Sequence, residues 1–565
     1  MSQRVLAIGY DGGTFALLKP WAEEGYLPTL GRLFGSCAWS TLLSTVPPNT
    51  GPAWSSFMTG KNPGKHGVTD FRGPLGPDFT RPLLSSRSIR SRKLWDILSR
   101  GGKRIVVLNV PMTYPVEPVD GIMVSGMLTP RVSPAMTYPA EFFPTLQNVT
   151  GGYRFALHWE FYKSEEQIEA FIQDLHECTD KLQALNRHLI EKEPWDFFLT
   201  VFDGMDRIQH LLWKILDPAH PLAERSTRER YLPLILGYYQ KVDRYLGELI
   251  EAAGREAAVF LFSDHGFGPL AGKFHLNTWL IEQGFLSLKK GAVQKWRRRH
   301  RVRASLARAM RRIDRWEWRK ALFRTLLEDR IDALSLWVKS MSETYSPRHV
   351  DWARTQAYSA GPVEQGVFVN LQGREPAGIV PPGKPFSEVR EQVALALRTL
   401  EDPRSGGPLV TDIFFKEDVY RGPLVERCPD VFFVLAGHRY TVSEEYFQSG
   451  ELFSPSPIET GYHRPEGILM ACAPWIRPGH RPHPARIEDL APTFLFCLGL
   501  PVPDDMDGRV LADLFEKEFL ERAPLTMEKT VPEGGPPEPA GEKKVFTEDE
   551  EERIKQQLRG LGYMD

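Results

Sequence analysis

Five short apolar runs, spread along almost the whole chain, most strongly limit the fold of this 565-residue sequence. They are rich in Val, Ile, Leu and Phe and lack a clear alternation of apolar and polar residues, as is typical of strands buried on both faces. Amphipathic stretches between them predict helices on both faces of a largely parallel sheet, an α/β fold. The predicted strands are residues 5–8, 105–110, 197–202, 258–262 and 468–471.

Composition and charge argue against several classes of protein. The net charge is -2, so no overall attraction to nucleic acid arises, and we expect no sequence-specific nucleic-acid binding. The five cysteines are far apart and form no Cys-x-x-Cys pair, which argues against a disulfide framework and a thiolate zinc site. Cys472 and Cys497 lie in apolar runs and are predicted to be plain core residues.

The sequence also carries no recognisable targeting segment. After its first four residues the chain enters a predicted strand, with no apolar leader or cleavage site. No apolar run approaches the roughly 20 residues that a membrane-spanning helix needs. We therefore expect a cytoplasmic protein.

Polar residues follow three of the predicted strands at the points where the strands end. Asp11 follows the first strand, Asp206 follows the third, and Asp264-His265 follows the fourth. In open α/β sheets, ligands bind beyond the carboxyl ends of the strands. These residues are therefore expected to meet at one edge of the sheet.

Thr50 lies at a predicted helix start, after a Pro-Pro-Asn sequence and two residues before Pro52. Two interpretations remain open. The hydroxyl can simply cap the helix by accepting a bond from a backbone N–H. Alternatively, the backbone donors and the helix dipole can bind an anion there, and a metal ion can convert the hydroxyl into an alkoxide nucleophile.

Asp206 and His210 are four residues apart, so on a helix they share one face and can chelate one metal ion. Asp203 is an alternative carboxylate, but its spacing from His210 fits one helical face less well. His463 precedes the last predicted strand and becomes a candidate ligand only in company with the others.

Taken together, these residues form two mixed nitrogen and oxygen sites. Such ligands suit zinc, with manganese as an alternative, and disfavour calcium or magnesium. Two divalent ions can hold an in-line displacement at phosphorus, one activating the attacking oxygen and the other stabilising the leaving oxygen. The candidate ligands are Asp11, Thr50, Asp206, His210, Asp264, His265 and His463.

An ordered set of short motifs resembles the alkaline phosphatase superfamily, and within it the type I phosphodiesterases and nucleotide pyrophosphatases. The resemblance covers roughly residues 5–514, apart from a basic segment after residue 288. The motifs are Ile8-Gly9-Tyr10-Asp11-Gly12, Leu27-Pro28-Thr29-Leu30, the run from Pro47 to Trp54, Lys65-His66-Gly67-Val68, Asp206-x-x-x-His210, Ser263-Asp264-His265-Gly266 and Gly461-x-His463.

This resemblance implies a three-layer α/β/α sandwich with a helical cap inserted after the Asp-His motif. It implies that Thr50 attacks phosphorus and forms a covalent phospho-enzyme, which an activated water releases. His66 matches a family position and is interpreted as structural. The implied ligands are Asp206, His210 and His463 for one ion, and Asp11, Asp264 and His265, with Thr50, for the other.

The chain departs from the nucleotide pyrophosphatase pattern at Ala53, where those enzymes have an Asn that binds a phosphate oxygen. The charge of the transition state must then be met otherwise, by the Thr50 backbone N–H and by Lys273 or His275, which become candidate substrate-binding residues. The sequence contains no Cys-x-Pro-x-Arg run, the motif of sulfatases, so sulfatase activity is not expected.

A basic segment, about 289–345, differs from its surroundings. Leu306, Met310 and Ile313 recur at helical spacing among many Arg and Trp residues, which predicts an amphipathic helical insertion. It is either a solvated cap over the catalytic domain or a surface, at 289–325, that contacts an acidic membrane or anionic substrates.

The chain is expected to divide into five parts. They are a first catalytic part at 1–288, the basic helical cap at 289–345, the cap remainder and second catalytic part at 346–515, a disordered Pro/Glu-rich linker at 516–546, and a C-terminal helix at 547–565.

The leading hypothesis for function is hydrolysis of phosphodiester or pyrophosphate bonds in a small phosphate ester or nucleotide, through Thr50 and two metal ions. A second hypothesis is a phosphomonoesterase or phosphotransferase of the same superfamily, although such phosphotransferases usually carry Ser as the nucleophile. A third is a peripheral membrane-docking protein that acts through the basic insertion.

Overall fold

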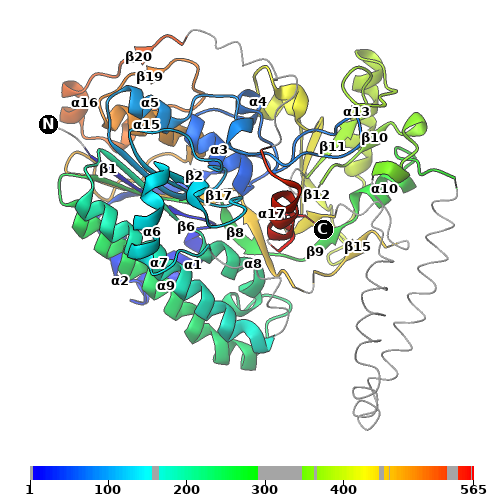
Figure 1. The fold of residues 1–565 in the computed structure, drawn as a ribbon. Helices are drawn as coiled ribbons and strands as arrows, with labels where there is room; N and C mark the ends of the chain where they lie inside the picture. The colour runs from blue at the N-terminus through cyan, green and yellow to red at the C-terminus, as the bar shows by residue number, and fades with distance from the viewer. Residues whose placement is uncertain are drawn as a thin grey trace.

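A nine-stranded sheet with helices on both faces forms the larger part of the molecule (Figure 1). Its strands, from one edge to the other, are β18 (Ala485–Arg486), β2 (Ala38–Leu43), β17 (Glu466–Cys472), β7 (Ala258–Phe262), β1 (Val5–Tyr10), β6 (Phe197–Phe202), β3 (Ile105–Val110), β4 (Gly121–Ser125) and β5 (Thr137–Tyr138). The computed structural model describes residues 4–155, 165–290, 347–361, 365–443, 451–456, 458–530, 545–560, 563 and 564.

The centre of this sheet is parallel. Strands β7, β1, β6, β3 and β4 run parallel to one another. Strand β17 pairs antiparallel with β7, and strand β5 pairs antiparallel with β4. All five predicted strands lie in the sheet, with every side chain of β1, β3, β6 and β7 buried. The prediction of a largely parallel sheet is therefore confirmed.

Helices cover the two faces and complete a three-layer sandwich, as predicted. Figure 1 shows α1 (Phe15–Glu23), α7 (Ile168–Lys192) and α9 (Arg225–Ala253) on one face, and α3 (Thr50–Thr59), α5 (Leu94–Arg100) and α15 (Leu490–Cys497) on the other. The ring of Phe494 in α15 contacts Phe57 of α3, Phe197 of β6 and Phe260 of β7. These aromatic contacts hold α3 against the sheet that it covers.

A smaller unit with its own apolar core follows the Asp-His motif. Its centre is an antiparallel sheet in the order β10 (Ala357–Tyr358), β11 (Gly366–Val369), β13 (Val431–Leu435) and β12 (Val410–Phe415), accompanied by α10 (Leu276–Glu282) and α13 (Lys384–Leu397). The described part of the insertion is thus mixed α/β rather than helical. Its core already includes Phe274, before the predicted boundary at 288. Residues 291–346, nearly all of the predicted basic cap, lie outside the described residues.

The predicted disordered linker at 516–546 is wrong for its first half. Residues 516–530 include helix α16 (Lys517–Arg522) and strand β20 (Met527–Glu528), which pairs with β19 (Val502–Pro503). Residues 531–544 lie outside the described residues. Helix α17 (Glu548–Gly560) falls where a C-terminal helix is predicted.

The cysteines differ from expectation at one pair. Cys37, just before β2, and Cys472, at the end of β17, form a disulfide between two adjacent strands. The prediction that Cys472 is a plain core residue is therefore wrong, because strand pairing brings together two cysteines far apart in the sequence. Cys497 is buried and free, as predicted. Among the helices of the described ranges, none is long and apolar enough to span a bilayer.

Helix α3 places Thr50 at its first position. Asn49 before it is extended, with φ -130° and ψ 146°, and the helix ends at Gly60, whose φ of 66° lies in the left-handed region that favours glycine. The Gly60 carbonyl accepts bonds from the backbone N–H groups of Asp507 and Gly508, at 2.9 and 3.1 Å. All ten residues of α3 are buried, so surrounding contacts fix the position of Thr50.

His66, at the end of the short helix α4 (Pro63–His66), stabilises α3 from the side. Its Nδ1 accepts a bond from the Val68 backbone N–H at 3.2 Å, so the proton sits on Nε2, which donates to Ser56 Oγ at 3.0 Å. Burial, with a contribution from Lys61, lowers the pKa of His66 from 6.5 to about 3. The structural role predicted for His66 agrees with these contacts.

We predict that this histidine makes folding sensitive to acid. Because its pKa is lower in the folded chain than in the unfolded chain, its contribution is complete above pH 6.5 and falls between 6.5 and about 3. One such proton changes the free energy of unfolding by about 1.4 kcal/mol per pH unit in that window. Urea unfolding should show His66→Gln clearly less stable than wild type near pH 7 and closer to it at about pH 4.5. The exposed His483→Gln is the control, and a constant difference for His66→Gln at both pH values would contradict the prediction.

Candidate active site

Six buried Asp and His side chains form two adjoining groups beyond the carboxyl ends of β1, β6 and β7. Within each group, one ligand atom per residue lies within 4.8 Å of the others. Asp206 Oδ1 of one group lies 4.0 Å from His265 Nε2 of the other, so the two groups share a border. The groups are Asp206, His210 and His463, and Asp11, Asp264 and His265. The structure thus brings together the six Asp and His side chains singled out from the sequence.

The first group depends on helix α8 (Gly204–Leu216) and strand β16 (Gly461–Arg464). Asp206 Oδ1 and His210 Nε2 are 3.5 Å apart across one turn of α8, and His463 Nε2 lies 3.0 Å from His210 Nε2. Strand β16 pairs with β8 (Gly266–Pro269), directly after the Asp-His motif, which holds His463 beside the second group. Asp203, the alternative carboxylate, instead accepts a bond from Arg207 at 2.8 Å.

The backbone fixes the tautomers of two of the histidines. His463 Nδ1 donates to the Pro48 carbonyl at 2.9 Å, and His265 Nδ1 donates to the Gly266 carbonyl at 3.1 Å. Their Nε2 lone pairs therefore point into the two groups, as in ligands of a metal. Burial lowers the pKa of His463 to about 4 and that of His265 well below its usual value. Both rings are neutral near pH 7 and available to bind a cation.

Three carboxylate oxygens in the groups, Asp11 Oδ1, Asp206 Oδ1 and Asp264 Oδ2, are buried and have no hydrogen-bond partner within the described residues. Burial raises the pKa of Asp11 and Asp264 well above the usual range, and the neighbouring carboxylates add to this rise. Burial acts in the same direction on Asp206, but His210 and His463 outweigh it and hold its pKa low.

Unpaired carboxylates in such a place are costly unless a cation compensates them. Nitrogen and oxygen donors in this mixture fit zinc or manganese better than calcium or magnesium. The residues present therefore fit divalent metal ions.

The Thr50 hydroxyl lies at the second group. Its Oγ1 is 3.2 Å from His265 Nε2, and Asp11 is held nearby by a bond from Trp54 Nε1 of the same helix, at 3.2 Å. Asn49, not Thr50, occupies the N-cap position of α3, and no side chain caps the helix. The interpretation of Thr50 as a mere helix cap is therefore wrong, since its hydroxyl faces the cluster.

Tyr563 also lies in this site and is not among the residues predicted from the sequence. Its phenolic oxygen is 2.6 Å from Thr50 Oγ1, and its ring packs edge-to-face on Phe71, with the ring centres 4.8 Å apart. Burial, followed by the charges of Asp206 and Asp11, raises the pKa of Tyr563 well above its usual value, so the phenol is neutral. The local sequence Gly-Tyr-Met-Asp gives no signal for this position, because only the tertiary structure brings the C-terminus here.

The two predicted substrate-binding residues lie around strand β9 (Gly272–Phe274). Lys273 Nζ is 3.9 Å from Glu459, and His275 Nε2 contacts Ser454 Oγ at 3.0 Å. The hydrogen bonds and ion pairs described for Thr50 and the six-residue cluster do not include either side chain. Their role in binding substrate stays a prediction.

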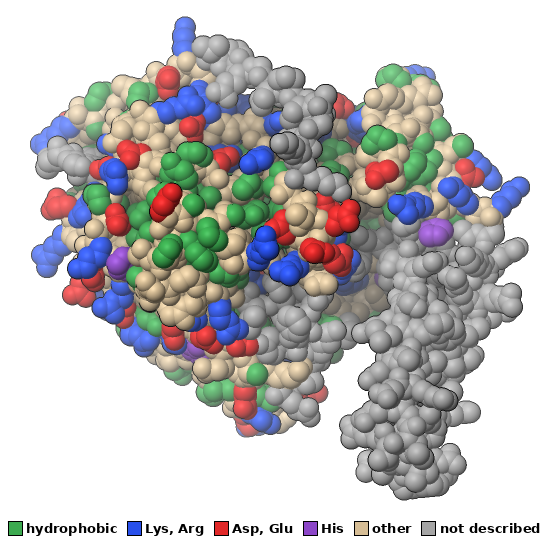
Figure 2. All heavy atoms as spheres, viewed as in Figure 1, with side chains coloured by type: hydrophobic (Ala, Val, Ile, Leu, Met, Phe, Trp, Pro, Cys, Tyr) green, Lys and Arg blue, Asp and Glu red, His purple; other side chains and the backbone are tan. Residues whose placement is uncertain are grey.

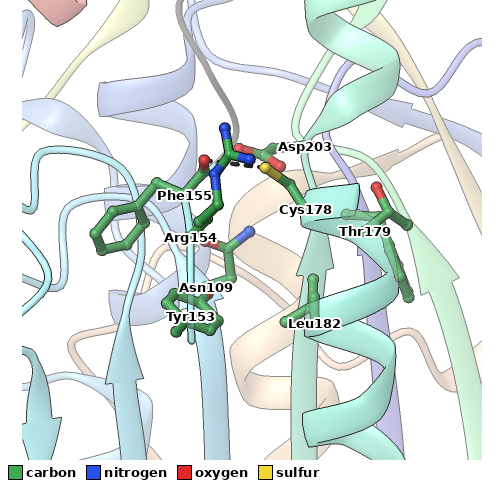
Figure 3. A pocket seen from close by; sticks show the side chains of 9 residues that line it. Asn109, Tyr153, Arg154, Phe155, Cys178, Thr179, Leu182 and Asp203 are labelled. Carbon is green, nitrogen blue, oxygen red and sulfur yellow. Dashed lines mark hydrogen bonds between the residues drawn. The ribbon is translucent and has the colours of Figure 1, made fainter. Parts of the chain in front are cut away.

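A small pocket is lined in part by Asp203 (Figure 3). Its lining is made by Asn109, Tyr153, Arg154, Phe155, Cys178, Thr179, Leu182, Phe202 and Asp203. None of these residues belongs to the two Asp/His groups. The pocket therefore shares no lining residue with the two groups.

Two solved structures are similar to this chain. A phosphonoacetate hydrolase from Sinorhizobium meliloti 1021, solved with phosphonoformate, superposes with a TM-score of 0.50 and 14% identity, over 88% of this chain and 95% of that chain. Human ectonucleotide pyrophosphatase / phosphodiesterase 5 gives a TM-score of 0.47 and 12% identity, over 91% of this chain and 100% of that chain. At such identity the first likeness shows the fold alone. No curated protein sequence matches the chain.

The family comparison reaches further than the structural ones. Residues 5–449 match the family described as "Type I phosphodiesterase / nucleotide pyrophosphatase", whose members are metal-dependent hydrolases. The match includes five of the six clustered ligands and Thr50, and His463 lies just beyond it. The chain therefore belongs to the type I phosphodiesterase / nucleotide pyrophosphatase family and is a phosphoric ester hydrolase of that type.

Proposed function

We propose that this enzyme hydrolyses phosphodiester or pyrophosphate bonds in a small phosphate ester or nucleotide, with Thr50 as nucleophile and two divalent metal ions. The observation that carries this proposal is the position of Thr50 Oγ1, 3.2 Å from His265 Nε2 and beside buried carboxylate oxygens that lack partners. A hydroxyl placed among cation-binding groups is suited to act as a nucleophile.

Each of the two groups of side chains would hold one cation. Asp206, His210 and His463 would hold one ion, and Asp11, Asp264 and His265, with Thr50, would hold the other. Bound there, divalent cations would lower the pKa of the Thr50 hydroxyl and neutralise charge on the reacting phosphate. The same donor set supports zinc, or manganese, in both positions.

Thr50 carries the covalent step. The Thr50 hydroxyl gives up its proton as Oγ1 forms a bond to phosphorus and the ester or anhydride bond breaks, and the leaving oxygen departs with the electron pair and takes up a proton. Water then attacks the phosphorus atom held by Thr50, and the bond from phosphorus to Oγ1 breaks. This step regenerates the hydroxyl and releases the second product. Helix α3 holds Thr50 rigidly for both steps, because every residue of the helix is buried.

The start of α3 offers a substitute for the Asn that Ala53 replaces. Ala53 is buried and its side chain cannot donate a hydrogen bond. The first N–H groups of a helix have no acceptor within the helix, and they form the positive end of its dipole. The N–H groups of Thr50 and Gly51 are therefore suited to bind a phosphate oxygen, as at other anion sites on helix N-termini.

We predict that the purified chain binds two zinc or manganese ions and that each group accounts for one. After loading and dialysis, elemental analysis should give about two ions per chain for wild type and about one for Asp206→Asn or Asp264→Asn. Ion binding should also raise the melting temperature, since free metal at about 100 times Kd adds about 2.7 kcal/mol of stability.

The matched control is Asp203→Asn. Asp203 lies three residues before Asp206, and its carboxylate pairs with Arg207. This variant should keep both ions. Loss of an ion in Asp203→Asn, with both kept in Asp206→Asn, would contradict the assignment of the first group.

We further predict that hydrolysis depends on the Thr50 hydroxyl. On a chromogenic phosphodiester, Thr50→Ala should lower kcat by about three orders of magnitude or more, because it removes the nucleophile. Thr50→Ser keeps a hydroxyl and should retain activity within about tenfold of wild type. Activity should vanish in excess chelator.

The control for this measurement is Thr59→Ala, which removes a buried hydroxyl from the opposite end of α3. It should leave kcat near the wild-type value. A Thr50→Ala variant as active as Thr59→Ala would rule out the nucleophile, and a faster rate on the matching monoester would move the enzyme to the phosphomonoesterase or phosphotransferase alternative.

A further inference from the structure

Helix α17 and the residues around it are docked on the catalytic domain. Phe546, Ile554 and Leu558 are buried and belong to the main apolar core. The ring of Phe546 stacks on Tyr114, with the ring centres 5.9 Å apart. In Figure 1, α17 lies between the large sheet and the smaller unit, far from the N-terminus. The C-terminal segment is therefore part of the packed structure.

Polar contacts fix the position of this segment. Gln557 Nε2 donates to the Thr129 carbonyl at 3.4 Å, and Glu550 lies 3.5 Å from Arg131. After the helix, the Tyr563 backbone N–H donates to the Leu558 carbonyl at 2.9 Å. This bond turns the chain back on the helix and directs Tyr563 toward the active site.

Tyr563 fills the space in front of the nucleophile. Only 1% of its surface is exposed, and its ring centre lies 4.8 Å from that of Phe71 and 5.8 Å from that of His463. Its phenolic oxygen is 2.6 Å from Thr50 Oγ1. The side chain therefore contacts both the nucleophile and a candidate metal ligand.

This position is incompatible with a bound substrate. An attacking oxygen must have phosphorus about 3–3.5 Å away, in line with the leaving group. At 2.6 Å, the phenolic oxygen of Tyr563 leaves no space for a phosphorus atom against that side of Thr50 Oγ1. Substrate and Tyr563 therefore compete for the same place.

The acidic residues of α17 lie at its start, at the opposite end of the helix from Tyr563. Residues 548–552 are all acidic, and Glu548, Asp549 and Glu552 are exposed. Figure 2 shows acidic side chains grouped where α17 reaches the surface. Glu550, Glu551 and Glu552 pair with Arg131, Lys555 and Arg559, so the block by Tyr563 does not depend on this charge.

We propose that α17 and Tyr563 form an autoinhibitory segment, in which Tyr563 blocks Thr50 until the segment leaves the site. This inference rests on the proposed function, because it takes Thr50 as the nucleophile. In the docked state the substrate site is closed, and the apparent affinity for phosphate is reduced by the fraction of molecules that are open.

The test compares full-length, metal-loaded wild type with Tyr563→Ala, using inorganic phosphate as ligand and the chromogenic phosphodiester as substrate. Removing the blocking side chain should tighten phosphate binding, measured by calorimetry, by about tenfold or more and raise kcat/KM by a similar factor. Tyr563→Phe removes only the oxygen beside Thr50 and should tighten phosphate binding by a smaller factor. The exposed Tyr26→Ala is the matched control and should behave as wild type.

The two readouts separate this inference from the proposed function. Tighter phosphate binding without turnover in any variant would show that Tyr563 occupies the phosphate site and would contradict Thr50 as the nucleophile. Unchanged phosphate affinity in both Tyr563 variants would overturn the autoinhibitory segment, whatever their activity. A tenfold loss of kcat with no gain in phosphate affinity would also overturn it, and would show that Tyr563 assists the reaction.

Discussion

Buried negative charge is the constraint on which the active site depends. Asp11, Asp206 and Asp264 are buried, and each has a carboxylate oxygen with no hydrogen-bond partner among the described residues. A folded chain tolerates such groups only if protons or cations neutralise them. The inward-facing nitrogens of His265 and His463 favour cations, because both rings present lone pairs rather than protons. The electrostatics of the fold thus favour cations in this site.

The scaffold turns this constraint into a defined geometry. Parallel strands β1, β6 and β7 end at one edge of the sheet and deliver Asp11, Asp206 and the Asp-His pair to the same place. Ser263 Oγ donates a bond to the Gly13 carbonyl at 2.9 Å and accepts a bond from the Ile468 backbone N–H at 2.8 Å. Ser263 therefore links the segments that carry Gly13 and Ile468 to its own. Helix α3, in one of the helical layers that cover the sheet, adds Thr50 to these residues. The active site is thus built from distant parts of the chain.

Much of this arrangement could be predicted because it depends on local patterns. The buried strands read as continuous apolar runs, and polar residues directly after them mark the sheet edge where Asp11 and Asp264 lie. The spacing of Asp206 and His210 follows from helical geometry alone, whereas the division of the ligands between two ions is what the resemblance implies.

The parts that were missed depend on long-range packing. The Cys37–Cys472 disulfide depends on the pairing of β2 with β17, and the contact of Tyr563 with Thr50 depends on the docking of the C-terminus. In the antiparallel sheet of the smaller unit, the partly exposed strand β12 lacks the buried apolar run that marks the strands of the main sheet.

Anomalous diffraction at the zinc edge, from crystals grown with zinc, tests the two-metal centre most directly. We expect two strong peaks, one among Asp206, His210 and His463 and the other among Asp11, Asp264 and His265, with ligand distances of about 2.0–2.2 Å. Peaks at neither group, or a single peak that leaves the carboxylates beside Thr50 without a cation, would contradict a two-metal mechanism at this nucleophile.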